Sequence, residues 1–342
     1  MAMHISGVGV LCACGRGPMA LEDALRSGQA APTMRRLPGA DTPSPVRAAP
    51  PEALEDKVLF KGMRRADRLG KFAVMAAADA WNDSGAAGMD PSRVGIVLAS
   101  ALGPHVRTFE FLDGILDFGH GAVSPTAFSH SVHNAAVSYI AAALQTHGPT
   151  LTVTDFCFGF QQAVAIAHCW LAEGRCDGVL VGAAEELGEV MLHVCRRMLT
   201  VPEDGRPWPF AFGRAHGPVP GEGAVFFMLS NRRGARDYAA LSLETDVPQD
   251  ADRVFVDPES FCGSETDFPG ALPAGAVLAD DSPPFGNMMT GSAFYCLVAA
   301  LTLRNGMRPS GLLSEEATSA VNTIACLKLG RRGERQTLVV SR

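Results

Sequence analysis

Apolar and polar residues follow one another along this chain in blocks that have the lengths of strands and helices. Residues 94–100 form a continuous apolar run with the length of a strand buried on both faces; buried strands are also predicted at 3–11 and 177–183, and a strand at 224–229. Segments 65–84 and 158–173 carry apolar residues at helical spacing, and each ends directly before a glycine. Further strands are predicted at 150–153, 241–244 and 336–340, and further helices at 19–26, 137–145 and 290–304.

Strands that alternate with helices in this way predict parallel βαβ units whose helices cover both faces of a sheet, and therefore an α/β fold. One stretch interrupts the alternation, because six prolines lie between Pro32 and Pro51. Proline fixes φ and has no N–H group, so we expect neither a regular helix nor a central strand in this stretch.

Composition narrows the possible functions. The 342 residues predict one large domain or two closely packed ones, and 47% of them are apolar. The formal charge of −7 argues against a nucleic-acid partner, which requires a basic face. The longer apolar runs, such as 294–303, are too short for a membrane span, and the first residues make a poor signal peptide. Nine scattered cysteines indicate reduced thiols, so we expect a cytoplasmic protein.

Cys157 is the first candidate for chemistry. It lies between the predicted strand at 150–153 and a helix predicted to begin at Phe158. The positive end of a helix dipole favours a thiolate, and the first free backbone N–H groups point at whatever is bonded to the sulfur. This position suits an acyl-thioester nucleophile with an oxyanion hole. A buried, inert cysteine explains the same position, so position alone leaves both interpretations open.

The segment around Cys157 carries a family resemblance. Residues 150–186, TLTVTDFCFGFQQAVAIAHCWLAEGRCDGVLVGAAEE, resemble the nucleophile segment of β-ketoacyl-acyl-carrier-protein synthases, which runs GPsltvdtACaSgaqAi and then iraGraDvvlaGgaEa. Residues 206–229 resemble the family's rPFdadRdGfvxGEGaavlvL, and MHISGVGVL resembles its opening strand. SPTAFSHSVHNAA, at 124–136, is similar to the branch found in aryl-polyene and related pigment clusters.

The resemblance implies a thiolase-type, five-layer α/β/α/β/α fold built of two related halves. It also implies that the whole chain forms an obligate dimer. We expect an N-terminal half at 1–235, which carries the nucleophile segment, and a shortened C-terminal half at 236–342. Glu185 is in register with a family glutamate that supports the active-site architecture, and we interpret it as a buried hydrogen-bond acceptor. The strand just before Cys157 is implied to continue the sheet across the dimer.

The departures from the family pattern concern its catalytic groups. Elongating members use two histidines and a lysine, in HGTGT and KxxxGH motifs, to decarboxylate a malonyl unit. Here Ser282 stands at the place of that lysine, Asn287 at that of the following histidine, and the HGTGT place near 256–266 has no histidine. The bulky Phe158 and Phe160 follow the nucleophile where the family prefers small residues, and we expect their rings to fill the acyl channel.

Other groups give weaker signals. His130 and His133 have the spacing of two metal ligands, but no suitable partner lies nearby in the sequence, so we interpret them as packing residues and expect no metal or cofactor. A set of arginines fits either a solvated helix face or a docking site for an acidic acyl carrier protein; it comprises Arg64, Arg65, Arg68, Arg196 and Arg197.

The sequence favours a β-ketoacyl synthase homologue of fatty acid or polyketide (polyene) biosynthesis that acts as a chain-length-factor-like subunit. It would pair with a competent ketosynthase and shape the pocket for the growing chain, although a homodimer stays open. The alternative is a Cys157-dependent acyltransferase or hydrolase on carrier-protein or coenzyme A thioesters. A third hypothesis is a slow condensing enzyme that uses Asn287 with a histidine from elsewhere, either His216 or one from a partner chain.

Overall fold

The computed structural model describes residues 2–27, 32–37, 41–56, 59, 66–208, 217–258, 272–273, 276, 278–280, 282–306, 320–330 and 332–342. The described strands are β1 (Met3–Cys12), β2 (Gly15–Arg16), β3 (Thr33–Arg35), β4 (Ser44–Val46), β5 (Val94–Ala99), β6 (Thr150–Val153), β7 (Gly178–Glu185), β8 (Gly223–Ser230), β9 (Ala239–Glu244), β10 (Arg253–Pro258), β11 (Leu278–Ala279), β12 (Thr323–Leu329) and β13 (Arg335–Ser341). The described helices of more than one turn are α1 (Pro18–Ser27), α2 (Arg68–Ser84), α3 (His105–Phe118), α4 (Pro125–Ser131), α5 (Ala135–Leu144), α6 (Gly159–Ala172), α7 (Glu189–Met198) and α9 (Ser292–Asn305), and α8 (Ser282–Phe285) is one turn.

One strand order occurs twice in the fold. In the first half the order is β1-β8-β7-β5-β6, and in the second half it is β9-β13-β12-β10-β11. In each half the strand that comes first in the sequence pairs antiparallel with the one that comes last. The three strands between them in the sequence run parallel to one another. The two sets join where β1 pairs with β9, at Met3–Ile5. The fold is therefore built of two related halves.

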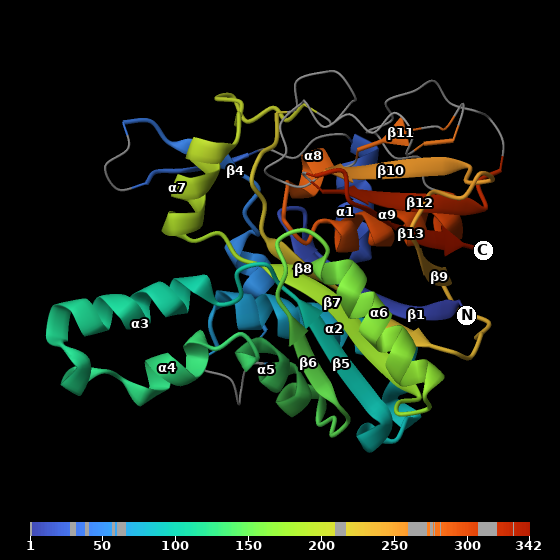
Figure 1. Cartoon of the computed structure of the whole chain (residues 1–342), viewed down its shortest axis with the longest axis horizontal. Coiled ribbons are helices and arrows are strands. Elements are labelled where there is room, and N and C mark those ends of the chain that lie inside the picture. Colours follow the sequence, from blue (N-terminus) through green and yellow to red (C-terminus); the bar gives the residue numbers. More distant parts are fainter. Residues whose placement is uncertain are drawn as a thin grey trace.

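Helices and sheets alternate in layers (Figure 1). α2 and α5 cover the outer face of the first half of the large sheet, and α6 and α9 lie between its two halves, where α6 contacts strands of both. β5, β7 and β8, on one side of this helix layer, are buried along their whole length, as a strand covered on both faces requires. The described residues thus form an α/β/α/β arrangement, four of the five layers expected.

Helix α2 shows how local sequence sets these layers. Asp67 accepts a hydrogen bond from the N–H of Gly70 and caps the helix, and Gly85 ends it at φ 67°. β1 runs so close to α2 that a Cβ atom at Gly9 would lie 2.0 Å from the carbonyl oxygen of Ala76. A glycine is needed there because no side chain fits between the strand and the helix.

The prediction that the proline-rich stretch forms no central strand is confirmed for its described residues. Its two short strands, β3 and β4, pair only with each other, in a sheet separate from the large one. Helices α3, α4 and α7 are absent from the sequence prediction. α3 and α4 form an arm that projects from the body (Figure 1), and His105 is the one buried residue of α3. Such a helix lacks the broad apolar face that identifies a core helix. None of the helices in the described ranges is long and apolar enough to cross a membrane.

Candidate functional site

Cys157 lies where the sequence predicts it, between the end of β6 and the first turn of α6. Its side chain is half-buried, and Sγ contacts the carbonyl oxygen of Leu329, in β12, at 3.9 Å. The candidate nucleophile of the first half therefore lies against a strand of the second half.

The backbone N–H groups next to the thiol are occupied. The N–H groups of Cys157 and Phe158 each donate a hydrogen bond to Asp155 Oδ1 at 2.7 Å. The other carboxylate oxygen of Asp155 accepts a hydrogen bond from Gln162 Nε2 at 3.1 Å, which fixes the side chain. The expectation that free N–H groups face the sulfur is therefore wrong for this structure, because an internal carboxylate accepts from them. Its negative charge also opposes the helix dipole that would favour a thiolate.

Glu185 ends β7 and is 6% exposed. It accepts hydrogen bonds from the N–H of Ala101 at 2.6 Å and from the hydroxyl groups of Thr290 and Ser100 at 3.1 and 3.4 Å. Burial raises its pKa to about 7, and these hydrogen bonds act in the opposite direction. The carboxyl thus ties the end of β5 to the start of the segment that leads into α9.

Asn287 is held by its backbone, whose N–H donates to Val219 and whose carbonyl accepts from Gly221. It lines a small cavity together with Glu185, and this cavity measures about 20 Å³, room for about one water molecule. Thr290 lies within 4.0 Å of the place a Cβ of Gly159 would take, so the segment after Asn287 reaches the first turn of α6. The fold therefore brings the segments of Cys157, Glu185 and Asn287 together.

The two aromatic rings after Cys157 have different surroundings. Phe160 is 1% exposed and packs against Phe227 in β8, with ring centroids 5.8 Å apart, inside the main core. Phe158 is half-buried and precedes the first residue of α6. Whether these rings fill an acyl channel stays a prediction.

A buried polar network that the sequence analysis did not find lies behind the site. Lys328 is fully buried in β12, and its Nζ is 3.2 Å from Asp257 Oδ2 and 3.4 Å from the carbonyl of Met289. Asp257 also accepts from the hydroxyl of Ser292, which in turn accepts from Gln161 Nε2. Burial raises the pKa of Asp257, and the charge of Lys328 acts against that rise.

The sequence did contain one signal for this network, because Lys328 is the only lysine after position 71. A signal for Asp155 was also present. The family pattern vdtAC places an aspartate three residues before the cysteine, whereas here Thr154 stands at that place and the aspartate follows one residue later.

The remaining predicted residues have other surroundings. His130 is stacked on Tyr139 and shares a hydrogen bond with its hydroxyl. Arg68 forms an ion pair with the fully buried Glu222, and Arg196 donates to the carbonyl of Thr42 at 2.8 Å. Several predicted positions lie outside the described residues, namely Arg64, Arg65, His216 and most of 256–266.

Comparisons with known proteins agree with this architecture. The family described as "Beta-ketoacyl synthase, N-terminal domain" matches residues 2–235. The granaticin polyketide putative β-ketoacyl synthase 1 of Streptomyces violaceoruber is 31% identical over 263 residues, which cover 69% of this chain and 61% of that protein. The chain thus spans about three fifths of the length of this relative.

Solved structures match over the whole chain. The structure of a β-ketoacyl synthase from Burkholderia phymatum has a TM-score of 0.81 at 18% identity and covers 100% of this chain and 99% of its own. The ishigamide ketosynthase/chain length factor has a TM-score of 0.79 at 18% identity and covers 99% and 98%. At these identities the structures establish the fold, which is the thiolase-type fold that the sequence predicts.

Proposed function

The chain belongs to the β-ketoacyl synthase family, and from this membership we propose that it is a chain-length-factor-like subunit of polyketide (polyene) or fatty acid biosynthesis. It pairs with an active ketosynthase and shapes the pocket in which that enzyme extends a chain held on an acyl carrier protein. In the pair, this chain contributes the family's fold and part of the pocket, and the partner performs decarboxylation and condensation.

One observation carries the proposal: Asp155 accepts the hydrogen bonds of the two N–H groups beside Cys157. A condensing enzyme needs free donors there, because the carbonyl oxygen of the acyl thioester gains negative charge in the transition state. An internal carboxylate in that place satisfies the donors and adds repulsion toward the developing oxyanion. Ser282 and Asn287 stand where the family has a lysine and a histidine, and this agrees with the same conclusion.

The size of the small cavity supports a role in limiting chain length. It lies between the end of β7, α7 and Asn287, and about 20 Å³ is far below the 300–1,000 Å³ of typical small-molecule sites. Side chains of Met191, Cys195 and Leu199 line it. In our proposal this closed wall limits how far a growing chain extends from the partner's active site.

The surface around β6 supports the pairing. β6 is an edge strand of the large sheet, and edge strands offer unpaired backbone groups to a further strand. Leu151 and Phe156 flank this edge at 42% and 58% exposure, and the arm exposes Leu116 and Phe118 at 81% and 75%. Apolar side chains exposed together mark protein interaction sites. We propose that β6 continues the sheet into the partner subunit.

The test is native mass spectrometry after co-expression with candidate active ketosynthases, each assayed for CO₂ release and product length with malonyl carrier protein. We expect a one-to-one heterodimer that extends chains, while this chain alone releases no CO₂. Leu151→Arg should abolish the heterodimer, whereas the control Met19→Arg, at a position 78% exposed on α1, should not. A stable homodimer that binds none of the ketosynthases, or CO₂ release by this chain alone, would overturn the proposal.

The alternative, an acyltransferase or hydrolase that depends on Cys157, makes a different prediction. It requires that Cys157 take an acyl group from a carrier-protein or coenzyme A thioester, and that Cys157→Ala abolish turnover. The occupied N–H groups weigh against it. Arg196 and Arg197, near the end of α7, are our candidates for carrier-protein docking. We place the protein in the cytoplasm because its nine scattered cysteines indicate reduced thiols.

A further inference from the structure

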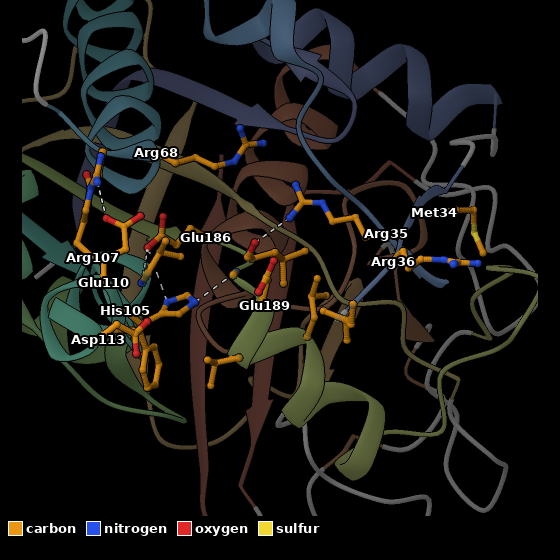
Figure 2. Close-up of a pocket in the computed structure, with 18 residues that line it drawn as sticks. Met34, Arg35, Arg36, Arg68, His105, Arg107, Glu110, Asp113, Glu186 and Glu189 are labelled. Atoms are coloured by element: carbon orange, nitrogen blue, oxygen red, sulfur yellow. Dashed lines mark hydrogen bonds and ion pairs between the residues drawn. The ribbon is translucent and has the colours of Figure 1, made fainter. Parts of the chain in front are cut away.

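A large charged cavity lies away from Cys157, between α3, α7, β3 and the start of α2 (Figure 2). We call it the α3–α7 cavity. Its volume of about 830 Å³ lies within the range of small-molecule binding sites. Four arginines and five carboxyl side chains line it, together with apolar residues such as Val106, Phe109 and Leu192. The cavity therefore combines charged groups of both signs with apolar walls.

His105, at the start of α3, is a buried residue that lines this cavity. Its Nδ1 has no hydrogen-bond partner among the described residues. It is 6% exposed, and its Nε2 accepts a hydrogen bond from the N–H of Gly188 at 3.3 Å. In the neutral ring the proton is therefore on Nδ1, which has no hydrogen-bond partner among the described residues. Glu186 Oε1 lies 3.8 Å from this nitrogen. Burial lowers the pKa of His105, which favours the neutral ring, and the backbone of Gly103 acts against this shift.

Two buried carboxyl groups share the same wall. Asp67 is 7% exposed; its Oδ1 caps α2, and its Oδ2 has no hydrogen-bond partner within the described part of the chain. Glu186 is 3% exposed and accepts from the N–H of Val106 at 3.2 Å. Burial, and then the nearby charges of Asp67 and Glu222, raise the pKa of Glu186 to about 8.

Three of the four arginines that line the cavity are engaged with other carboxylates. Arg35 and Arg68 form ion pairs with the buried Glu222, and Arg107 pairs with Glu110 one turn along α3. Among the described residues neither Asp67 nor Glu186 forms an ion pair with an arginine, although the charge of Arg107 acts on Asp67, and Figure 2 shows His105 and Glu186 facing each other.

Glu186 is also a departure from the family pattern. The family segment GgaEa has a small residue after its glutamate, where this chain has a second carboxyl. Along a strand, consecutive side chains point to opposite sides. Glu185, the last residue of β7, bonds Thr290, while Glu186, which follows it, accepts from the N–H of Val106 and lies 3.8 Å from His105 Nδ1.

We propose that the α3–α7 cavity binds a small aliphatic primary amine, with its ammonium group between Asp67 and Glu186 and its carbon chain against the apolar wall. The ammonium group donates hydrogen bonds to Asp67 Oδ2 and to the ionised Glu186. Once ionised, Glu186 can also accept a hydrogen bond from His105 Nδ1–H. An anionic ligand would instead face more carboxyl groups than arginines. This site does not involve Cys157, and it shares α3 with the arm whose exposed residues support the proposed pairing.

The test is titration calorimetry of the purified chain with 1,4-diaminobutane, alongside neutral 1,4-butanediol and anionic succinate. We expect the diamine alone to bind. At pH 7 binding should release close to one proton, because Glu186 loses its proton beside the ammonium; heats in two buffers of different ionisation enthalpy measure this. Glu186→Gln should weaken binding at least tenfold and remove the proton release, whereas the control Glu173→Gln, at an exposed position directly after α6, should change neither.

A second variant distinguishes loss of the binding site from loss of the folded structure. Val190 lines the cavity at 41% exposure, so Val190→Trp should fill part of the volume, leave the melting temperature unchanged and weaken binding. The proposal is overturned if folded wild-type protein binds no diamine, if Glu186→Gln binds it equally well, or if succinate binds in its place. Equal binding by wild type and by both cavity variants would mean adventitious surface association and would equally refute the site.

Discussion

Replacement of Asp155 by alanine tests the central feature of the site. The substitution removes the acceptor of the N–H groups of Cys157 and Phe158, each bonded at 2.7 Å, and removes a negative charge at the N-terminus of α6. Loss of such a capping acceptor costs about 0.5–2 kcal/mol of unfolding free energy. The same change frees two backbone donors beside the thiol.

The gain in reactivity follows from the same geometry. One oxyanion donor contributes about 10²–10³ in rate, or about 2.7–4 kcal/mol. The charge removed at the helix end contributes about 0.3–1 kcal/mol more toward the thiolate. We therefore expect Asp155→Ala to be acylated at Cys157 at least tenfold faster than wild type, even if the freed donors are imperfectly placed.

Intact-protein mass spectrometry after incubation with acyl carrier protein thioesters measures this rate. Wild type, Asp155→Ala and the double variant Asp155→Ala/Cys157→Ala are compared, and the double variant should gain no mass. Iodoacetamide labelling of Cys157 in each protein shows that the thiol is accessible. The reasoning is refuted if wild type and Asp155→Ala are acylated at the same rate while both thiols react with iodoacetamide.

Three further outcomes follow from the buried charges. Glu222→Gln leaves two arginines without their shared carboxylate and should cost about 3 kcal/mol in chemical unfolding, whereas Glu173→Gln should stay within about 0.5 kcal/mol. Lys328→Met should lower the free energy of unfolding by about 3 kcal/mol, because it leaves the buried Asp257 without its cation. Adding Asp257→Asn should recover part of that loss; if the effects of the two substitutions simply add, the pairing is contradicted. Because the fold raises the pKa of Glu186 from 4.5 to about 8, the folded state binds more protons than the unfolded state between these values. The melting temperature should therefore fall as pH rises from 5 to 8, and Glu186→Gln should flatten that slope; an unchanged slope would show that Glu186 is not responsible.

The elements nearest to the candidate nucleophile were predictable because their signals are local. β6 was predicted at the residues where it occurs, and α6 within one residue at each end, since a β-branched run and a 3.6-residue period fix those elements without distant contacts. Helix α3 was missed for the opposite reason. Its apolar residues face outward on the arm, so its pattern carries no core-facing stripe.

The candidate site was predictable in part. Cys157 between a strand and a helix, and the departures at Ser282 and Asn287, are properties of sequence position. The role of Asp155 depends on a side-chain orientation that aims one oxygen at two N–H groups, and the sequence pattern gave no means of choosing that orientation over a solvated one.

The sequence by itself determined the alternation of strands and helices, the family, and the place of the thiol before a helix, because each depends on neighbours within a few turns. The tertiary structure alone decided what surrounds that thiol. Leu329 contacts Cys157 across 172 positions of sequence, and Lys328 meets Asp257 through the pairing of β12 with β10. The α3–α7 cavity likewise combines Asp67, His105 and Glu186 from three separate elements. Contacts of this kind form only when the layers pack together, so the local periodicity of the sequence does not predict them.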